Sequence, residues 1–153
     1  MTSRINFAKA APGVMEAMLV LEKYLAGCKL DESLLNLVKM RASQINGCAY
    51  CLDMHSKDAR AAGESEQRLF LLNAWREAPC YSERERAALA WTEALTMVTE
   101  GHVPDEVYEL ASRYFNEKEL GDLSLAVVAI NGWNRLSIAF RPEVGGYQPR
   151  RKG

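Results

Sequence analysis

The sequence lacks any long run of one charge, since 19 basic residues stand against 20 acidic ones in a chain of 153. Proteins that bind nucleic acids or anionic membranes usually carry dense basic clusters. Because this sequence has no such cluster, neither is an expected partner. A small basic group, Arg150, Arg151 and Lys152, closes the chain and is interpreted as a solvated tail. No continuous apolar run approaches the roughly 20 residues that span a bilayer, so no membrane partner is expected.

The N-terminal segment also lacks the continuous apolar core of a secretory signal. Its apolar residues are interrupted by Arg4, Lys9, Glu16 and Glu22. We therefore expect a cytoplasmic, reducing compartment. In such a compartment two neighbouring cysteines are more often catalytic or metal-binding than a structural crosslink.

Strand-type alternation of β-branched residues is scarce, whereas helix-forming residues are abundant. Ser82 followed by Glu85, for example, is a capping box that begins a helix. We expect a single all-α domain over 1–153, an orthogonal or bundle-like helical array with its core at about 12–141. The tail, 142–153, is expected to be irregular and loosely held unless a partner subunit pins it. Start and stop signals predict about seven helices, near 12–27, 31–47, 48–63, 65–78, 82–101, 104–114 and 117–141.

Residues 44–55 read QINGCAYCLDMH, with two cysteines three residues apart and a histidine four residues later. Asn46 and Gly47 favour a helix start at this point, so Cys48, Cys51 and His55 are expected on one ridge of a helix. The two cysteine Cα atoms then lie roughly 5 to 6 Å apart, within disulfide reach. A helix start favours a thiolate and an imidazole accepts the thiol proton, so the pattern suits a two-electron redox centre.

The residues alone leave alternatives open at this site. Proximity to His55 favours Cys51 as the attacking thiolate and Cys48 as the resolving thiol, whereas the helix dipole favours Cys48 as the attacking sulfur. A zinc site needs a fourth ligand, and the remaining soft ligands, Cys80 and His102, are isolated from each other. A thioredoxin-type site requires a preceding strand, which is not predicted. Two buried cysteines with a chance spacing are the remaining alternative.

The stretch QINGCAYCLDMHSKDARAAG resembles the signature of alkylhydroperoxidase D-like proteins, within the carboxymuconolactone decarboxylase superfamily. Later stretches such as AINGWNRLSIAFR extend the likeness over about residues 30–141. The resemblance implies an all-α subunit that forms trimers or hexamers and reduces alkyl hydroperoxides or hydrogen peroxide. It implies peroxidatic Cys51, resolving Cys48 and relay His55, regeneration by a thiol reductant, and no metal or organic cofactor.

Two other functions fit the same scaffold. One is thiol–disulfide exchange or redox sensing without peroxide turnover. The other is a carboxymuconolactone decarboxylase-like enzyme acting on a small molecule. Family members that decarboxylate a lactone generally lack the cysteine pair, so its presence favours the redox branch.

One position departs from the family pattern. The founding members carry a proton-relay glutamate twelve residues before the first cysteine, where this chain has Asn36. Glu93, on an otherwise apolar helix, is the candidate replacement, because a charge there is costly unless it is paired. We expect Glu93 to contact His55. The alternative is a glutamate on the exposed flank of its helix.

Other noticeable residues receive structural interpretations. Tyr50, between the cysteines, is expected either to shape the substrate entrance or to face outward. Cys28 and Cys80 are interpreted as small buried hydrophobes, and His102 as a surface or capping residue. Two asparagines, Asn131 and Asn134, are expected at a subunit contact or in solvent. The tryptophans are interpreted as core residues: Trp75, Trp91 and Trp133.

Overall fold

The computed structural model describes residues 1–149. Within these residues the chain forms eight α-helices and one short 3-10 helix, with no β-strand, which confirms the predicted all-α class. The elements are α1 (Phe7–Ala10), α2 (Pro12–Ala26), α3 (Glu32–Asn46), α4 (Ala49–Ala61), α5 (Glu66–Leu71), η1 (Leu72–Ala74), α6 (Glu83–Thr96), α7 (Asp105–Tyr114) and α8 (Glu117–Phe140).

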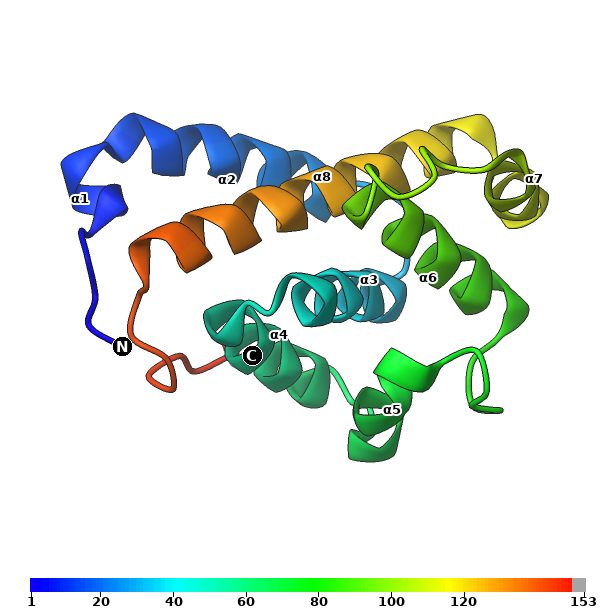
Figure 1. Ribbon diagram of the computed structural model, residues 1–153, viewed down its shortest axis with the longest axis horizontal. Helices are drawn as coiled ribbons and strands as arrows, with labels where there is room; N and C mark the ends of the chain where they lie inside the picture. Colours follow the sequence, from blue (N-terminus) through cyan, green and yellow to red (C-terminus); the bar gives the residue numbers. More distant parts are fainter. Residues whose placement is uncertain (150–153) are drawn as a thin grey trace.

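The central helix is α3, which packs against α4, α6 and α8. Figure 1 shows α3 nearly end-on, with α4 beneath it and the pair α2 and α8 running side by side above it. Apolar side chains of α3 face two ways. Leu34 and Val38 join a cluster with α6, α7 and α8, whereas Leu37 and Met40 join a second cluster with α4, α5 and α6. The segment with Cys48 and Cys51 therefore begins directly after this central helix.

Helix ends follow the local chemistry of the sequence. The capping box of Ser82 and Glu85 is present at the start of α6, as predicted. That helix ends at Thr96 rather than near residue 101, because the β-branched Val98 and Thr99 follow it and favour helix poorly. The helix predicted at 65–78 is shorter and passes into a 3-10 turn at Leu72. A short helix not predicted from the sequence, α1, is capped by the Asn6 side chain.

Helix α8 passes the length and composition test for a membrane span, which the sequence reading did not anticipate. The core helix of a folded domain meets the same test. Here α8 packs against α2, α3, α4, α6 and α7, and buries residues such as Leu123, Val127 and Ile130. Its apolar character is therefore explained by its central position in the fold.

Residues 142–149 are irregular, as predicted, but they are not loosely held. The segment returns along α4 of the same chain. The Lys57 ammonium donates to the carbonyl oxygens of Gly145 (3.0 Å) and Tyr147 (3.1 Å). These bonds attach the C-terminal segment to α4, the helix that Cys48 caps and that contains Cys51. Residues 150–153, with the basic cluster, lie outside the described residues.

Candidate active site

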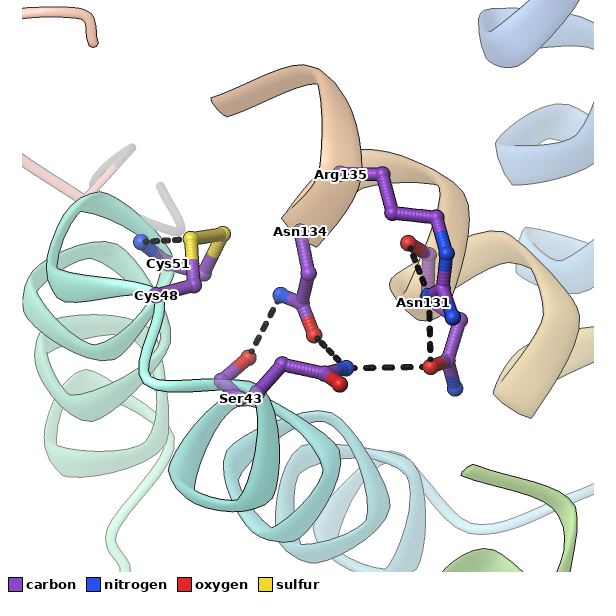
Figure 2. Close-up of a disulfide and its surroundings, with 7 residues drawn as sticks. Ser43, Cys48, Cys51, Asn131, Asn134 and Arg135 are labelled. Carbon is purple, nitrogen blue, oxygen red and sulfur yellow. Dashed lines mark hydrogen bonds between the residues drawn. A yellow bond between two sulfur atoms is a disulfide. The ribbon is translucent and has the colours of Figure 1, made fainter. Parts of the chain in front are cut away.

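Cys48 and Cys51 form a disulfide at the start of α4, with Cα atoms 5.3 Å apart, which confirms the predicted spacing (Figure 2). Gly47 makes the turn between α3 and α4 at φ 68°, a conformation that favours glycine. Cys48 is then extended and caps α4, its sulfur accepting the Cys51 N–H at 3.3 Å. Cys48 is thus the N-cap rather than a first-turn residue, and its sulfur lies where free backbone N–H groups stabilise a thiolate.

A buried amide network beneath the disulfide joins α3 to α8 (Figure 2). The Asn46 amide donates to Asn134 at 2.8 Å and to Asn131 at 3.0 Å, and Asn134 in turn donates to Ser43 at 3.0 Å. Asn134 is fully buried. The expectation of a subunit contact or solvent exposure was therefore wrong for Asn134, whereas Asn131 is half-buried and a subunit contact there stays a prediction. Both amides hold the α3 end from which the cysteine turn departs.

His55 lies four residues after Cys51 on α4 and is 7% exposed. Residues at this spacing share a helix face, so the imidazole and the Cys51 sulfur occupy one buried ridge. Burial, together with the nearby Lys39 charge, lowers the pKa of His55 from 6.5 to about 3. The ring is therefore neutral at neutral pH, and a neutral imidazole is the form that accepts a proton.

The two ring nitrogens of His55 have different surroundings. Nδ1 lies 3.9 Å from the Asp58 carboxylate, one turn further along α4. Nε2 is buried and has no hydrogen-bond partner among the described residues. An unpartnered buried polar atom is costly and rare in native structures, and it marks a group that a reacting species can engage.

Two neighbouring cavities border the site. One, of about 720 Å³, is lined by His55, Tyr50 and Trp133 together with the N-terminal segment, including Phe7. The other, of about 760 Å³, borders Cys48. Tyr50 lines both cavities, and its entrance role stays a prediction. The imidazole and Cys48 therefore border adjoining spaces that share part of their lining.

Glu93 does not pair with His55, so that predicted contact was wrong. Its carboxylate, 6% exposed, accepts hydrogen bonds from Trp75 Nε1 (2.8 Å), Arg41 Nε (2.9 Å) and an Arg76 guanidinium N–H (2.5 Å). Burial raises the pKa of Glu93, but these three donors outweigh it and hold that pKa below its ordinary value. The carboxylate is buried because it is fully paired, and a catalytic role for it stays an untested prediction.

The carboxylate beside His55 is Asp58, which was not predicted as a site residue. Its position three residues after the histidine on one helix was a usable signal, because residues at this spacing are neighbours. Asn36, at the position of the missing glutamate, lines the same cavity as Asp58 and Lys39. Cys28 and Cys80 are free and only partly buried. Within residues 1–149 no three His, Cys, Asp or Glu side chains are grouped as a metal ion requires.

Comparison with known proteins identifies the family. The model of the carboxymuconolactone decarboxylase family matches residues 12–94, more than half of the chain. The chain belongs to the carboxymuconolactone decarboxylase family. The uncharacterized protein YdfG of Bacillus subtilis (strain 168) is 42% identical over 139 residues, 91% of this chain and 95% of its own length.

Solved structures of related proteins share the fold. Protein ATU0492 of Agrobacterium tumefaciens, of unknown function and a candidate AhpD antioxidant defence protein, matches with a TM-score of 0.92 and 42% identity. The match covers 95% of this chain and 100% of that one, so the fold is AhpD-like. The apo debrominase Bmp8 matches with a TM-score of 0.77 and 21% identity, over 90% of this chain and 74% of its own. That likeness concerns the fold alone.

Proposed function

We propose that this carboxymuconolactone decarboxylase family protein is a thiol-dependent peroxidase that reduces organic hydroperoxides or hydrogen peroxide. The observation that carries the proposal is the pairing of Cys48 and Cys51 at the start of α4 with a buried, neutral His55 on the same helix. A disulfide that closes across one helical turn can open and close without unfolding the helix. The site therefore suits repeated two-electron oxidation and reduction.

The reaction balances with one peroxide and one dithiol per cycle. The reduced Cys51 thiolate attacks the O–O bond, becomes a sulfenic acid and releases an alcohol or water. The Cys48 thiol then condenses with the sulfenic acid, forming the disulfide and releasing a second water. An external dithiol reduces the disulfide and leaves as its own disulfide. No metal or organic cofactor takes part in these steps.

His55 handles the protons of this cycle. In its neutral form it takes the Cys51 proton when the thiolate forms and returns a proton to the departing oxygen. Nε2 is the nitrogen proposed for this exchange, since residues 1–149 offer it no hydrogen-bond partner. Cys51 is assigned as the attacking sulfur because it is nearer to His55 along the helix. Cys48 borders its own cavity, which suits it to meet the reducing thiol.

The test measures peroxide consumption by the reduced protein with a dithiol reductant and tert-butyl hydroperoxide. We expect Cys51→Ser to abolish turnover, and Cys48→Ser to stop after one attack with a sulfenic acid that dimedone traps at Cys51. Cys80→Ser and Cys28→Ser are the matched controls and should retain the wild-type rate. Peroxide loss that is equally slow in wild type and Cys51→Ser would contradict the proposal.

Thiol–disulfide exchange without peroxide turnover is the second candidate. The observation that favours it is the cavity beside Cys48, which gives a partner thiol access to that sulfur. In this case the disulfide would exchange rapidly with a protein dithiol while peroxide oxidised the reduced pair no faster than it oxidises free cysteine. Assembly into trimers or hexamers stays a prediction from the resemblance, and a cytoplasmic location stays a prediction from the N-terminal sequence.

A further inference from the structure

The C-terminal segment lies against the face of α4 that carries Asp53 and Lys57. The Asp53 carboxylate accepts the Gly145 N–H at 3.2 Å and the Lys57 ammonium at 3.0 Å. The same ammonium donates to the Gly145 and Tyr147 carbonyl oxygens. The backbone of the segment is therefore held at two points by one ion pair, and this fixes where the Tyr147 ring can lie.

The Tyr147 hydroxyl donates to Asp58 Oδ1 at 2.7 Å. The other oxygen of the same carboxylate, Oδ2, lies 3.9 Å from His55 Nδ1. Tyr147, Asp58 and His55 thus form a continuous polar row that begins in the irregular tail and ends at the buried imidazole. A histidine whose second nitrogen faces a carboxylate has its tautomer and ring orientation set by that carboxylate.

The charges around His55 explain why this carboxylate matters. Lys39 on α3 opposes a positive imidazole, as burial does. Glu22 on α2 is already engaged by Lys39 (3.5 Å) and by the Trp133 indole N–H (3.0 Å). Glu143 of the tail lines the same cavity as His55, and among the described residues it forms no ion pair with the imidazole. Asp58 is the carboxylate within 4 Å of the ring, so it is the group placed to balance a proton on it.

We propose that Asp58 and Tyr147 are positioning residues for His55, so that the C-terminal tail is a working part of the redox site. The inference rests on the proposed function and deepens it. Asp58 holds the proton of the neutral imidazole on Nδ1, which leaves Nε2 as the acceptor for the Cys51 thiol. When Nε2 takes that proton, Asp58 balances the new positive charge. Tyr147, through its hydrogen bond to Oδ1, keeps the carboxylate turned toward the ring.

The test uses the full chain, reduced, with ¹⁵N-labelled histidine. The chain has only two histidines, so His102→Gln assigns the His55 signals. We expect wild type to show the Nδ1-protonated tautomer, Asp58→Ala to show a mixture, and Tyr147→Phe to lie between them. Asp58→Glu should restore the wild-type tautomer. A matched control is Tyr108→Phe, which removes a hydroxyl from an exposed tyrosine on α7 and should change nothing.

A second readout is the rate at which iodoacetamide alkylates Cys51 in a Cys48→Ser background. We expect this rate to fall about 30-fold with Asp58→Ala, within the roughly 10- to 100-fold loss seen when a histidine loses its orienting partner. With Tyr147→Phe, which leaves that partner in place, we expect a smaller fall of about 5-fold. An Nε2-protonated ring in wild type, or unchanged tautomers and rates in both variants, would overturn the inference. Neither readout involves peroxide. Absence of peroxide turnover in wild type therefore counts against the proposed function alone.

Discussion

Glu93 on α6 and His55 on α4 are buried to nearly the same extent, 6% and 7% exposed. They differ in how many hydrogen-bond partners their polar atoms have. Glu93 accepts hydrogen bonds from Trp75, Arg41 and Arg76. His55 has one carboxylate at 3.9 Å from Nδ1 and no hydrogen-bond partner at Nε2. The first group has its charge fully compensated, whereas the second is held neutral and incompletely bonded.

This difference is the basis on which we propose a reactive role for His55 and a structural one for Glu93. A buried carboxylate with every oxygen engaged has no capacity left to exchange a proton, because any change of its protonation state breaks several bonds. A buried imidazole with a free nitrogen keeps that capacity, at a cost in stability that the fold elsewhere offsets. Glu93 was predicted to contact His55 because its sequence position indicated a buried charge. That position did not indicate which groups donate hydrogen bonds to the carboxylate.

The largest expected effect is the loss of peroxide-reduction rate when His55 is replaced. We expect His55→Gln to lower the rate of peroxide reduction by about 10² to 10³-fold, the range of general acid–base catalysis, while the protein stays folded. Glu93→Gln should retain the wild-type rate per folded molecule. Stopped-flow oxidation of the reduced proteins, normalised to folded protein by circular dichroism, measures both. A large rate loss in folded Glu93→Gln would restore Glu93 to the catalytic set.

The opposite result is expected for stability. Glu93→Gln leaves the partly buried Arg41 guanidinium without its anion, so we expect the free energy of unfolding to fall by about 3 kcal/mol. Urea denaturation of the reduced proteins measures this loss. The control, Glu109→Gln, removes a carboxylate from an exposed position on α7 and should change stability by less than about 0.5 kcal/mol. Equal effects in the two variants would show that the Glu93 bonds contribute little.

His55 and Glu93 should also differ in how they make the free energy of unfolding depend on pH. The folded pKa of His55, about 3, lies below its unfolded value of 6.5, so as pH falls below 6.5 the unfolded chain takes up the proton first. Stability is therefore lost from pH 6.5 downward, by about 2 to 3 kcal/mol at pH 4.5. His55→Gln should remove this slope. Glu93, with its lowered pKa, adds an acid loss that begins near and below its ordinary value of 4.5. A slope that persists unchanged in His55→Gln between pH 6.5 and 5 would show that another group titrates there.

The smallest effect concerns the amide network beneath the disulfide. Asn134→Ala removes the acceptor for Asn46 and the donor to Ser43, and we expect a loss of about 1 to 2 kcal/mol in the free energy of unfolding. Asn73→Ala, at an exposed position of η1, is the matched control and should be nearly neutral. Because the network supports the cysteine turn without touching the sulfurs, the peroxide rate should change less than twofold. A tenfold rate loss would place Asn134 among the residues that position Cys48.

The sequence predicted the helices well because their ends carry local signals. Pro12 and Gly27 bound α2, Asp31 and Gly47 bound α3, and a capping box opens α6, all as the structure has them. The redox pair was equally readable, since three-residue spacing on a helix fixes the distance between two cysteines. By contrast α1, only four residues long, offered too little periodicity to be recognised.

Contacts between distant segments were not readable in the same way. Asn134 and Asn46 are 88 residues apart, and Tyr147 and Asp58 are 89 apart. The residues that neighbour a polar side chain in the sequence do not predict whether it contacts solvent, another subunit or a buried partner. Asn134 was therefore misplaced, and residues 142–149 of the tail were wrongly expected to be loose.

The sequence by itself determined the helical class, the family and the closeness of Cys48 to Cys51, because helix geometry converts spacing directly into position. Only the tertiary structure decided that Glu93 pairs with Trp75, Arg41 and Arg76 and not with His55, and which polar atoms lack partners among the described residues. The physical reason is that pairing and desolvation depend on whichever elements pack around a side chain, and that neighbourhood exists only once the chain has folded.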